Sequence, residues 1–196
     1  MTHHFNKLMI GGQWIETRSG EQIDVVDPST GSLIGSIPRG SSAEVDLAVS
    51  AARQAADGEW GAMSMADRGR LLTRFAIRLE ESVEELAQLE SLDVGKPIGM
   101  ARREIGTLIR NFEFYGGAAD KLHGEVIPTN KGLYALMLRE PLGVTAHIIP
   151  WNGPAAVFGR TVAASLAAGN ACVVKPAEDA CLSVLRLAEM MQDAGF

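Results

Sequence analysis

The chain has 196 residues, of which 46% are hydrophobic and 21% are charged, as in an ordinary folded protein. This composition excludes a disordered tail, a collagen-like repeat and a low-complexity chain. The 18 basic and 24 acidic residues give a net charge of −6 without a Lys/Arg cluster, which argues against nucleic acid and anionic membranes as partners. Cys172 and Cys181 are too few for a disulfide framework or a cysteine-rich zinc site, so no metal site is expected.

The amino-terminal sequence lacks the apolar stretch of a signal peptide, and no apolar stretch is long enough to span a membrane. We therefore expect a cytoplasmic protein, with an organelle matrix after loss of a transit signal as the alternative. The first forty residues read as short strands. Gly11-Gly12 is the turn of one predicted hairpin, and residues 27–31 form a second turn between two further strands.

Three helices are predicted next. Ser41 and Glu44 form a capping box that opens the first helix, which ends near residues 57–58. Ser64 opens a second, longer helix, whose apolar stripe continues without interruption to its end at Gly95. A third helix follows Pro97 and ends before residue 124.

Residues 124–140 contain two apolar segments, GEVIP and LYALMLRE, which predict two strands joined by a turn at residues 129–132. The second segment shows little alternation of polar and apolar residues. One face of it must therefore be covered, either by this chain or by a partner.

The remaining sequence alternates strands and helices. VTAHII predicts a buried strand, residues 155–168 a helix, ACVVK another buried strand, and residues from about 179 to 194 a last helix. This order is a βαβ unit, so we expect an α/β fold with a parallel sheet and a right-handed crossover. The chain stops where a further strand is expected, which favours a segment of a longer protein.

Polar residues follow both predicted parallel strands. Trp151 and Asn152 come after the first, and Lys175 and Glu178 come at the end of the second. Ligands of open α/β sheets bind beyond the carboxyl ends of the strands, so both groups are expected to face one crevice. The Asn152 amide can donate to a developing oxyanion. Lys175 and Glu178 can donate to and accept from ribose hydroxyls.

Each of these residues also has a simpler interpretation. Asn152 can be an ordinary turn residue between two prolines, and Lys175 and Glu178 can be a surface ion pair at the start of a helix. Cys172, in a buried strand, is expected to be inert. Cys181 begins the last helix, where the helix dipole is a possible cause of a lowered thiol pKa. The sequence contains no G-x-G-x-x-G after a strand, no phosphate-binding P-loop and no nucleophile elbow.

Four segments, VVDPSTGSLIGSIP, LESLDVGKPI, EPLGVTAHIIPWNGP and AAGNACVVKPAE, together resemble the aldehyde dehydrogenase superfamily, and the resemblance extends over the whole chain. It implies a Rossmann-like cofactor domain and the oxidation of an aldehyde to a carboxylic acid with NAD or NADP, through a thioester on a cysteine. It implies that Asn152 donates to the oxyanion. The strand-end residues that it assigns to cofactor binding are Ile148, Ile149, Pro150, Trp151, Lys175, Pro176, Ala177 and Glu178.

The resemblance further implies that Lys175 and Glu178 hold the adenosine ribose. Glu178 favours NAD over NADP, because its carboxylate would repel a 2′-phosphate. The two strands between residues 124 and 141 resemble an oligomerisation arm, which implies a homodimer or homotetramer when the protein is complete. The segment also departs from the family pattern, because Gly153 stands where an aromatic residue is common and Thr161 where lysine is common.

These features predict three regions. Residues 1–123 would be the amino-terminal part of the cofactor domain, residues 124–141 the arm, and residues 142–196 the first part of the cofactor-binding sheet. Neither cysteine matches the position of the family's nucleophile, and its general-base glutamate is also missing. We therefore expect the chain to be inactive alone. The alternatives are a non-catalytic nucleotide-binding or oligomerisation module from a truncated gene, and a degraded gene product without function.

Overall fold

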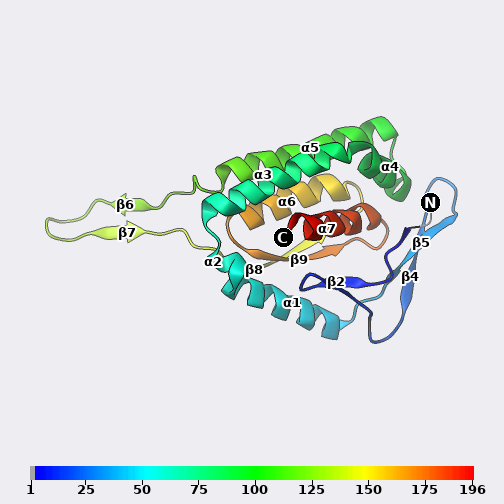
Figure 1. The fold of residues 1–196 in the computed structure, drawn as a ribbon, viewed down its shortest axis with the longest axis horizontal. Coiled ribbons are helices and arrows are strands. Elements are labelled where there is room, and N and C mark those ends of the chain that lie inside the picture. The colour runs from blue at the N-terminus through cyan, green and yellow to red at the C-terminus, as the bar shows by residue number, and fades with distance from the viewer. Residues whose placement is uncertain (1–2) are drawn as a thin grey trace.

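The computed structural model describes residues 3–196, in which helices and small sheets form an α/β fold. Figure 1 shows a body of helices packed around a pair of strands, with one long hairpin extending from it. No helix in the described range is both long enough and apolar enough to cross a membrane.

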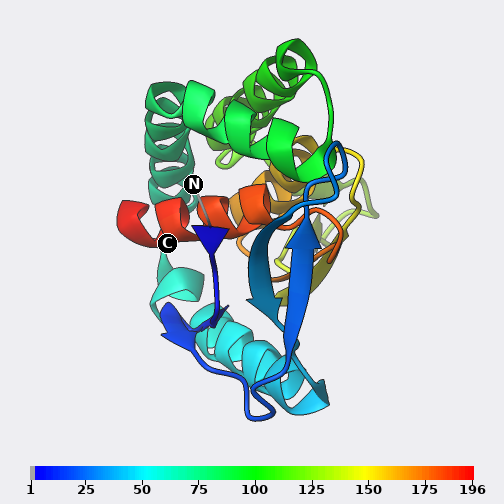
Figure 2. The ribbon, with the colours of Figure 1, turned by 90° about the vertical axis from the view of Figure 1, so that its right-hand side faces the viewer.

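Short strands form the amino-terminal region. The hairpin of β2 (Leu8–Ile10) and β3 (Gln13–Ile15) turns at Gly11 and Gly12, both with positive φ, as predicted. A second sheet has β5 (Leu33–Pro38) between antiparallel β4 (Gln22–Val26) and parallel β1 (His3–His4). Figure 2 shows β4 and β5 standing beside α7 (Leu182–Ala194). Val25 and Ile37 of this sheet pack against Leu182 in a small core.

The capping signals place the first helices correctly. Helix α1 (Ser42–Asp57) begins with a complete capping box between Ser41 and Glu44. A single turn, α2 (Glu59–Ala62), which the sequence did not indicate, leads to α3 (Met65–Glu81). The Ser64 hydroxyl accepts from the Asp67 amide and caps α3.

The second predicted helix is two helices. The chain leaves the helical conformation at Ser82, and α4 (Val83–Val94) continues beyond it. The Ser82 amide donates to the Leu79 carbonyl and the Ser82 carbonyl accepts from the Leu86 amide, so one residue ends α3 and begins α4. Serine suits such a position because its side chain competes with helical hydrogen bonds. The apolar stripe crosses the break because Leu79 and Leu86 are both fully buried, which is why periodicity alone missed it.

The βαβ unit follows the third helix and the hairpin. Helix α5 (Ile98–Ala118) begins after Pro97, as predicted. Strand β8 (Val144–Ile149), α6 (Pro154–Ala167) and β9 (Ala171–Pro176) come next, and β8 and β9 pair in parallel. Helix α7 begins three residues later than predicted, because residues 177–180 form a tight turn in which the Ala180 amide donates to the Ala177 carbonyl.

The main core lies between the helices. Phe75 of α3, Phe112 of α5 and Phe158 of α6 are buried, and the rings of Phe75 and Phe112 meet edge to face at 4.8 Å. Helix α6 covers one side of the β8–β9 pair, and α1 covers the other (Figure 1). The strand pair is therefore held between two helical layers, which fixes the direction in which its carboxyl ends point.

The extended hairpin consists of β6 (Glu125–Ile127) and β7 (Ala135–Met137), which pair antiparallel. Both strands are shorter than predicted, and the loop between them is longer than the predicted turn. Every residue from Lys121 to Leu142 is exposed except Ala135, which is partly buried. This chain therefore does not cover the apolar residues of the hairpin.

A glycine pair tests the packing of α6 on α5. A β-carbon at Gly159 of α6 would lie 2.9 Å from the Leu108 α-carbon of α5, whereas one at Gly106 would meet nothing within 4 Å. We expect Gly159→Ala to lower the free energy of unfolding by about 1–3 kcal/mol, because two backbones are forced apart. The control Gly106→Ala should raise it by about 0.5–1 kcal/mol. Urea unfolding followed by circular dichroism measures both, and equal effects would contradict this packing.

Candidate functional site

The parallel pairing brings the two predicted polar clusters to one edge. Ile149 at the end of β8 lies opposite Pro176 at the end of β9. Trp151 and Asn152 therefore follow one strand, and Lys175 and Glu178 lie at the end of its neighbour. The two clusters share the carboxyl end of one strand pair, and a common ligand crevice there stays a prediction.

Lys175 and Glu178 form an exposed ion pair. The Lys175 ammonium donates to the Glu178 carboxylate at 2.6 Å, and this hydrogen bond lowers the pKa of Glu178. Glu178 lies in the turn that follows β9, not in the first turn of α7. Exposed pairs of this kind contribute little to stability, so both groups can exchange this contact for a ligand at small cost.

The predicted cleft-lining residues divide between two faces. The Ile148 side chain is 80% exposed and Trp151 is 60% exposed, whereas Ile149 is 1% exposed and lies in the core. Neighbouring residues of a strand point to opposite faces, so a ligand on the open face would meet the Ile148 side chain but only the main chain of Ile149. Pro150 is exposed, and Pro176 and Ala177 are partly buried beside it along the edge.

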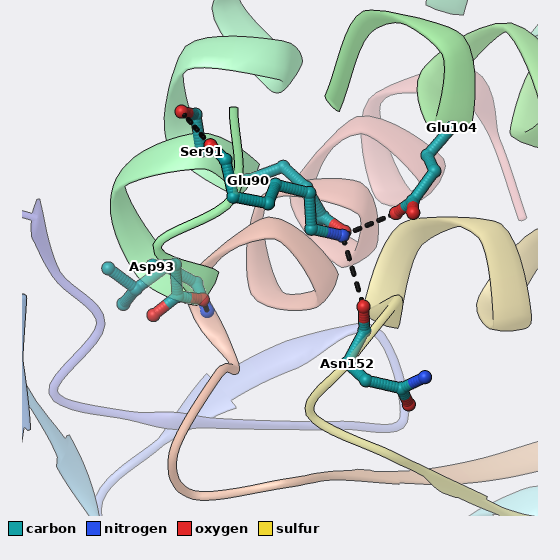
Figure 3. A network of polar contacts seen from close by, with 7 residues as sticks. Glu90, Ser91, Asp93, Glu104 and Asn152 are labelled. Carbon is teal, nitrogen blue, oxygen red and sulfur yellow. Dashed lines mark hydrogen bonds and ion pairs between the residues drawn. The ribbon is translucent and has the colours of Figure 1, made fainter. Parts of the chain in front are cut away.

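Asn152 lies in the loop between β8 and α6. Its side chain is exposed, and within residues 3–196 the side-chain amide has no hydrogen-bond partner. Its main-chain carbonyl accepts from the Lys96 ammonium at 3.2 Å. Figure 3 shows this carbonyl directed at the lysine and the side-chain amide directed away from it. An amide that is free in this way can donate to a ligand.

A buried charged cluster behind this loop was not predicted. The Lys96 ammonium contacts Glu90 of α4 at 3.0 Å and also binds Glu104 of α5 (Figure 3). Burial raises the pKa of Glu90, an effect that the nearby Lys96 opposes. The sequence held a signal, because Glu90 follows Leu86 by four residues and Glu104 precedes Leu108 by four, which places both carboxylates on apolar faces.

A second buried carboxylate holds the start of α7. Asp93, at the end of α4, accepts from the Leu182 amide at 2.7 Å. Burial raises the Asp93 pKa to about 7, although the Leu182 hydrogen bond opposes this shift. This contact fixes the segment that leads from β9 into α7 and carries Glu178.

The two cysteines are poorly placed for nucleophilic chemistry. Cys172 is partly buried on β9, and burial raises the pKa of its thiol. The helix dipole does not lower the Cys181 pKa, which the sequence had left open. Burial and the nearby Asp93 raise the Cys181 pKa to about 12, which outweighs any effect of the helix dipole.

Gly153 and Thr161, the two residues that depart from the resembled family pattern, make ordinary contacts. Gly153 has extended backbone, and a β-carbon there would lie 3.6 Å from the Glu104 carboxylate, an ordinary contact. The position therefore does not require glycine. The Thr161 hydroxyl donates to the Val157 carbonyl of its own helix at 3.0 Å.

Comparison with known proteins decides the family. A model of the aldehyde dehydrogenase family matches residues 14–196. The chain belongs to this family. Among curated aldehyde dehydrogenases, it is 46% identical to the hydroxyisobutyraldehyde dehydrogenase of Mycolicibacterium austroafricanum, covering 96% of this chain and 37% of that protein.

Solved aldehyde dehydrogenase structures have the same fold. The NAD-dependent aldehyde dehydrogenase of Sinorhizobium meliloti superposes with a TM-score of 0.96 at 37% identity, covering 100% of this chain and 39% of that one. The NAD⁺ complex of the Bacillus cereus aldehyde dehydrogenase gives a TM-score of 0.94 at 36% identity, covering 97% of this chain and 39% of that one. The chain thus spans about two fifths of the length of these aldehyde dehydrogenases.

We expect Cys181 to resist alkylation in the native protein. With a pKa of about 12, its thiolate fraction at pH 8 is on the order of one in ten thousand, and the side chain is fully buried. Iodoacetamide labelling of Cys172→Ser, which leaves Cys181 as the single thiol, should be slow in buffer and fast in urea. The matched control is Cys181→Ala, in which Cys172 is the single thiol and its labelling rate is measured. Equal labelling rates of Cys181 in buffer and urea would contradict its burial.

Proposed function

We propose that this chain supplies the amino-terminal portion of an NAD-dependent aldehyde dehydrogenase that oxidises an aldehyde to a carboxylic acid. The observation that carries the proposal is the shared carboxyl end of β8 and β9, where the exposed Asn152 follows β8 and the Lys175–Glu178 pair lies at the end of β9. Membership of the family supplies the reaction class. The two solved relatives described above are an NAD⁺ complex and an NAD-dependent enzyme, and this supports the cofactor class.

The strand-end residues fit a dinucleotide. A ribose presents two neighbouring hydroxyls, and Lys175 offers N–H donors while Glu178 offers carboxylate acceptors. Both are exposed beyond the carboxyl ends of parallel strands, and the exposed Ile148 offers an apolar surface on the same strand pair. When bound, NAD would accept the hydride. Lys175 and Glu178 would position the ribose, and Asn152 would donate to the aldehyde oxygen as it gains charge.

The covalent step needs residues from outside this chain. Oxidation through a thioester requires an accessible cysteine thiolate, and Cys181 is buried with a pKa of about 12. Cys172 faces Thr145, whose hydroxyl lies 3.6 Å from its sulfur, on a strand covered by helices. We therefore propose that the nucleophilic cysteine and the general-base glutamate come from the segment that relatives carry beyond this match, and that this chain alone does not oxidise aldehydes.

The exposed hairpin supports a homo-oligomer. Its apolar residues Val126, Leu136 and Leu138 are 71%, 66% and 73% exposed, and no other part of the described chain covers them. We propose that the β6–β7 arm joins copies of the complete enzyme into a dimer or tetramer. The three regions 1–123, 124–141 and 142–196 and a cytoplasmic location belong to the same proposal.

The proposal is tested through cofactor choice. The complete enzyme can be made as a chimera in which this chain precedes the carboxyl-terminal segment of the Mycolicibacterium enzyme. We expect NAD to be preferred over NADP, because the Glu178 carboxylate repels a 2′-phosphate. Glu178→Ser should raise the NADP to NAD ratio of kcat/KM by roughly tenfold, which corresponds to about 1.4 kcal/mol.

Asp179→Ser is the matched control, because it removes another exposed carboxylate, one residue further along the chain. It should leave the ratio within about twofold, because no ribose contact is proposed for Asp179 and exposed charges are screened by salt. Equal use of both cofactors by the unmutated enzyme, or equal effects of the two substitutions, would contradict the role of Glu178.

A further inference from the structure

We infer that Lys96 is a positioning residue, whose buried ammonium fixes the loop that carries Asn152 through the main-chain carbonyl of that residue. This inference rests on the proposed function, because it concerns the geometry of the oxyanion donor. Lys96 itself is expected to touch neither aldehyde nor cofactor.

The donors of the Lys96 ammonium are all matched by acceptors. A lysine ammonium has three N–H donors. In this structure it has three acceptors, namely one carboxylate oxygen each of Glu90 and Glu104 and the carbonyl oxygen of Asn152. The Lys96 side chain is only 6% exposed, so water has little access to replace a lost partner. If the loop moved away, a charged N–H would be left buried without an acceptor, which is strongly unfavourable.

The Lys96 ammonium is itself held in place by two carboxylates. Glu90 is 0% exposed and Glu104 is 17% exposed, and they approach Lys96 from α4 and α5 respectively. Gly95 precedes the lysine with φ of 75°, and a β-carbon there would lie 2.7 Å from Pro28. The Ser91 hydroxyl donates to the Lys96 carbonyl at 2.7 Å. The lysine therefore transmits the position of two core helices to the loop.

The loop that carries Asn152 lies between two buried residues but is itself exposed at Trp151 and Asn152. Ile149 before it and Pro154 after it are buried, but Trp151 and Asn152 between them are exposed. Within residues 3–196, no hydrogen bond holds the Asn152 side chain, so the contact of its carbonyl with Lys96 is the polar anchor of this residue. Fixing the carbonyl fixes the peptide plane on one side of the Asn152 α-carbon and limits where the side-chain amide can point. Figure 3 shows the carbonyl bound to the lysine and the amide pointing away from it.

A double-mutant cycle in the chimeric enzyme tests this inference. Asn152→Ala should lower kcat by about 10²–10³, the usual effect of losing one oxyanion donor. Lys96→Met should lower kcat by about 10- to 100-fold, because a small displacement of a catalytic group has effects of this size. It should leave KM for NAD within about twofold, since Lys175 lies on β9 and Glu178 in the turn that follows it, away from the loop that Lys96 contacts. In the Asn152→Ala background, Lys96→Met should have little further effect, because its target is gone.

Two further variants separate positioning from general destabilisation. Lys96→Met alone leaves the buried Glu90 carboxylate without its cation, which can prevent folding. The double variant Lys96→Met/Glu90→Gln removes both charges, and the same loss of kcat is expected in it. Leu72→Val removes a buried methylene from α3 at a residue outside the Lys96 hydrogen-bond cluster, and it should lower the melting temperature but not kcat. Multiplicative losses in the Asn152→Ala background, or an equal loss of kcat in Leu72→Val, would overturn the positioning role.

A measurement on the chain itself is independent of catalysis. With 5-fluorotryptophan at its 3 tryptophans, the ¹⁹F signal of Trp151 reports the order of the loop. It should broaden or shift in the Lys96 variants and remain unchanged in Leu72→Val, with Trp14 and Trp60 as internal controls. If the unmutated chimera oxidises no aldehyde but this signal changes as expected, the proposed function fails and the positioning of the loop stands. An unchanged Trp151 signal overturns the inference.

Discussion

The parallel ladder between β8 and β9 runs in one register from Val144 opposite Ala171 to Ile149 opposite Pro176. A slip of one residue would turn each side chain to the other face of the sheet and would separate the two polar clusters. The register is protected from both sides, by α1 on one face and by α6 on the other. The close approach of Gly159 to α5 sets the position of α6, and through α6 that of the strand ends.

The charged residues of the site form one exposed ion pair and one largely buried cluster. Lys175 and Glu178 are exposed and paired only with each other, which suits groups that exchange partners when a ligand binds. Lys96, Glu90 and Glu104 are largely buried, and breaking a buried pair is costly. The rigid cluster therefore lies behind the loop, and the exchangeable pair lies on the open edge. This division is consistent with a site that holds its donor fixed while binding a cofactor reversibly.

Much of this arrangement was predictable from local sequence. Ser41 and Ser64 mark helix starts because their side chains cap backbone amides, and VTAHII and ACVVK have the length and composition of parallel strands. The predicted burial of these strands is only partial, because Ala146 and Ile148 of β8 are exposed. The break at Ser82 escaped prediction because the burial pattern is continuous across it. The Lys96 cluster escaped because its members are separated by 6, 8 and 56 residues, and only the packed helices bring them together. The direction of the Cys181 pKa shift likewise depends on burial, which the position of this residue at the start of a helix did not reveal.

The central claim is that the shared edge of β8 and β9 binds the cofactor. A crystal structure of the chimeric enzyme with NAD measures this most directly. We expect the adenosine ribose hydroxyls to lie within hydrogen-bond distance, about 2.7–3.2 Å, of the Lys175 ammonium and the Glu178 carboxylate. A ribose bound elsewhere, with Lys175 and Glu178 still paired only with each other, would contradict it.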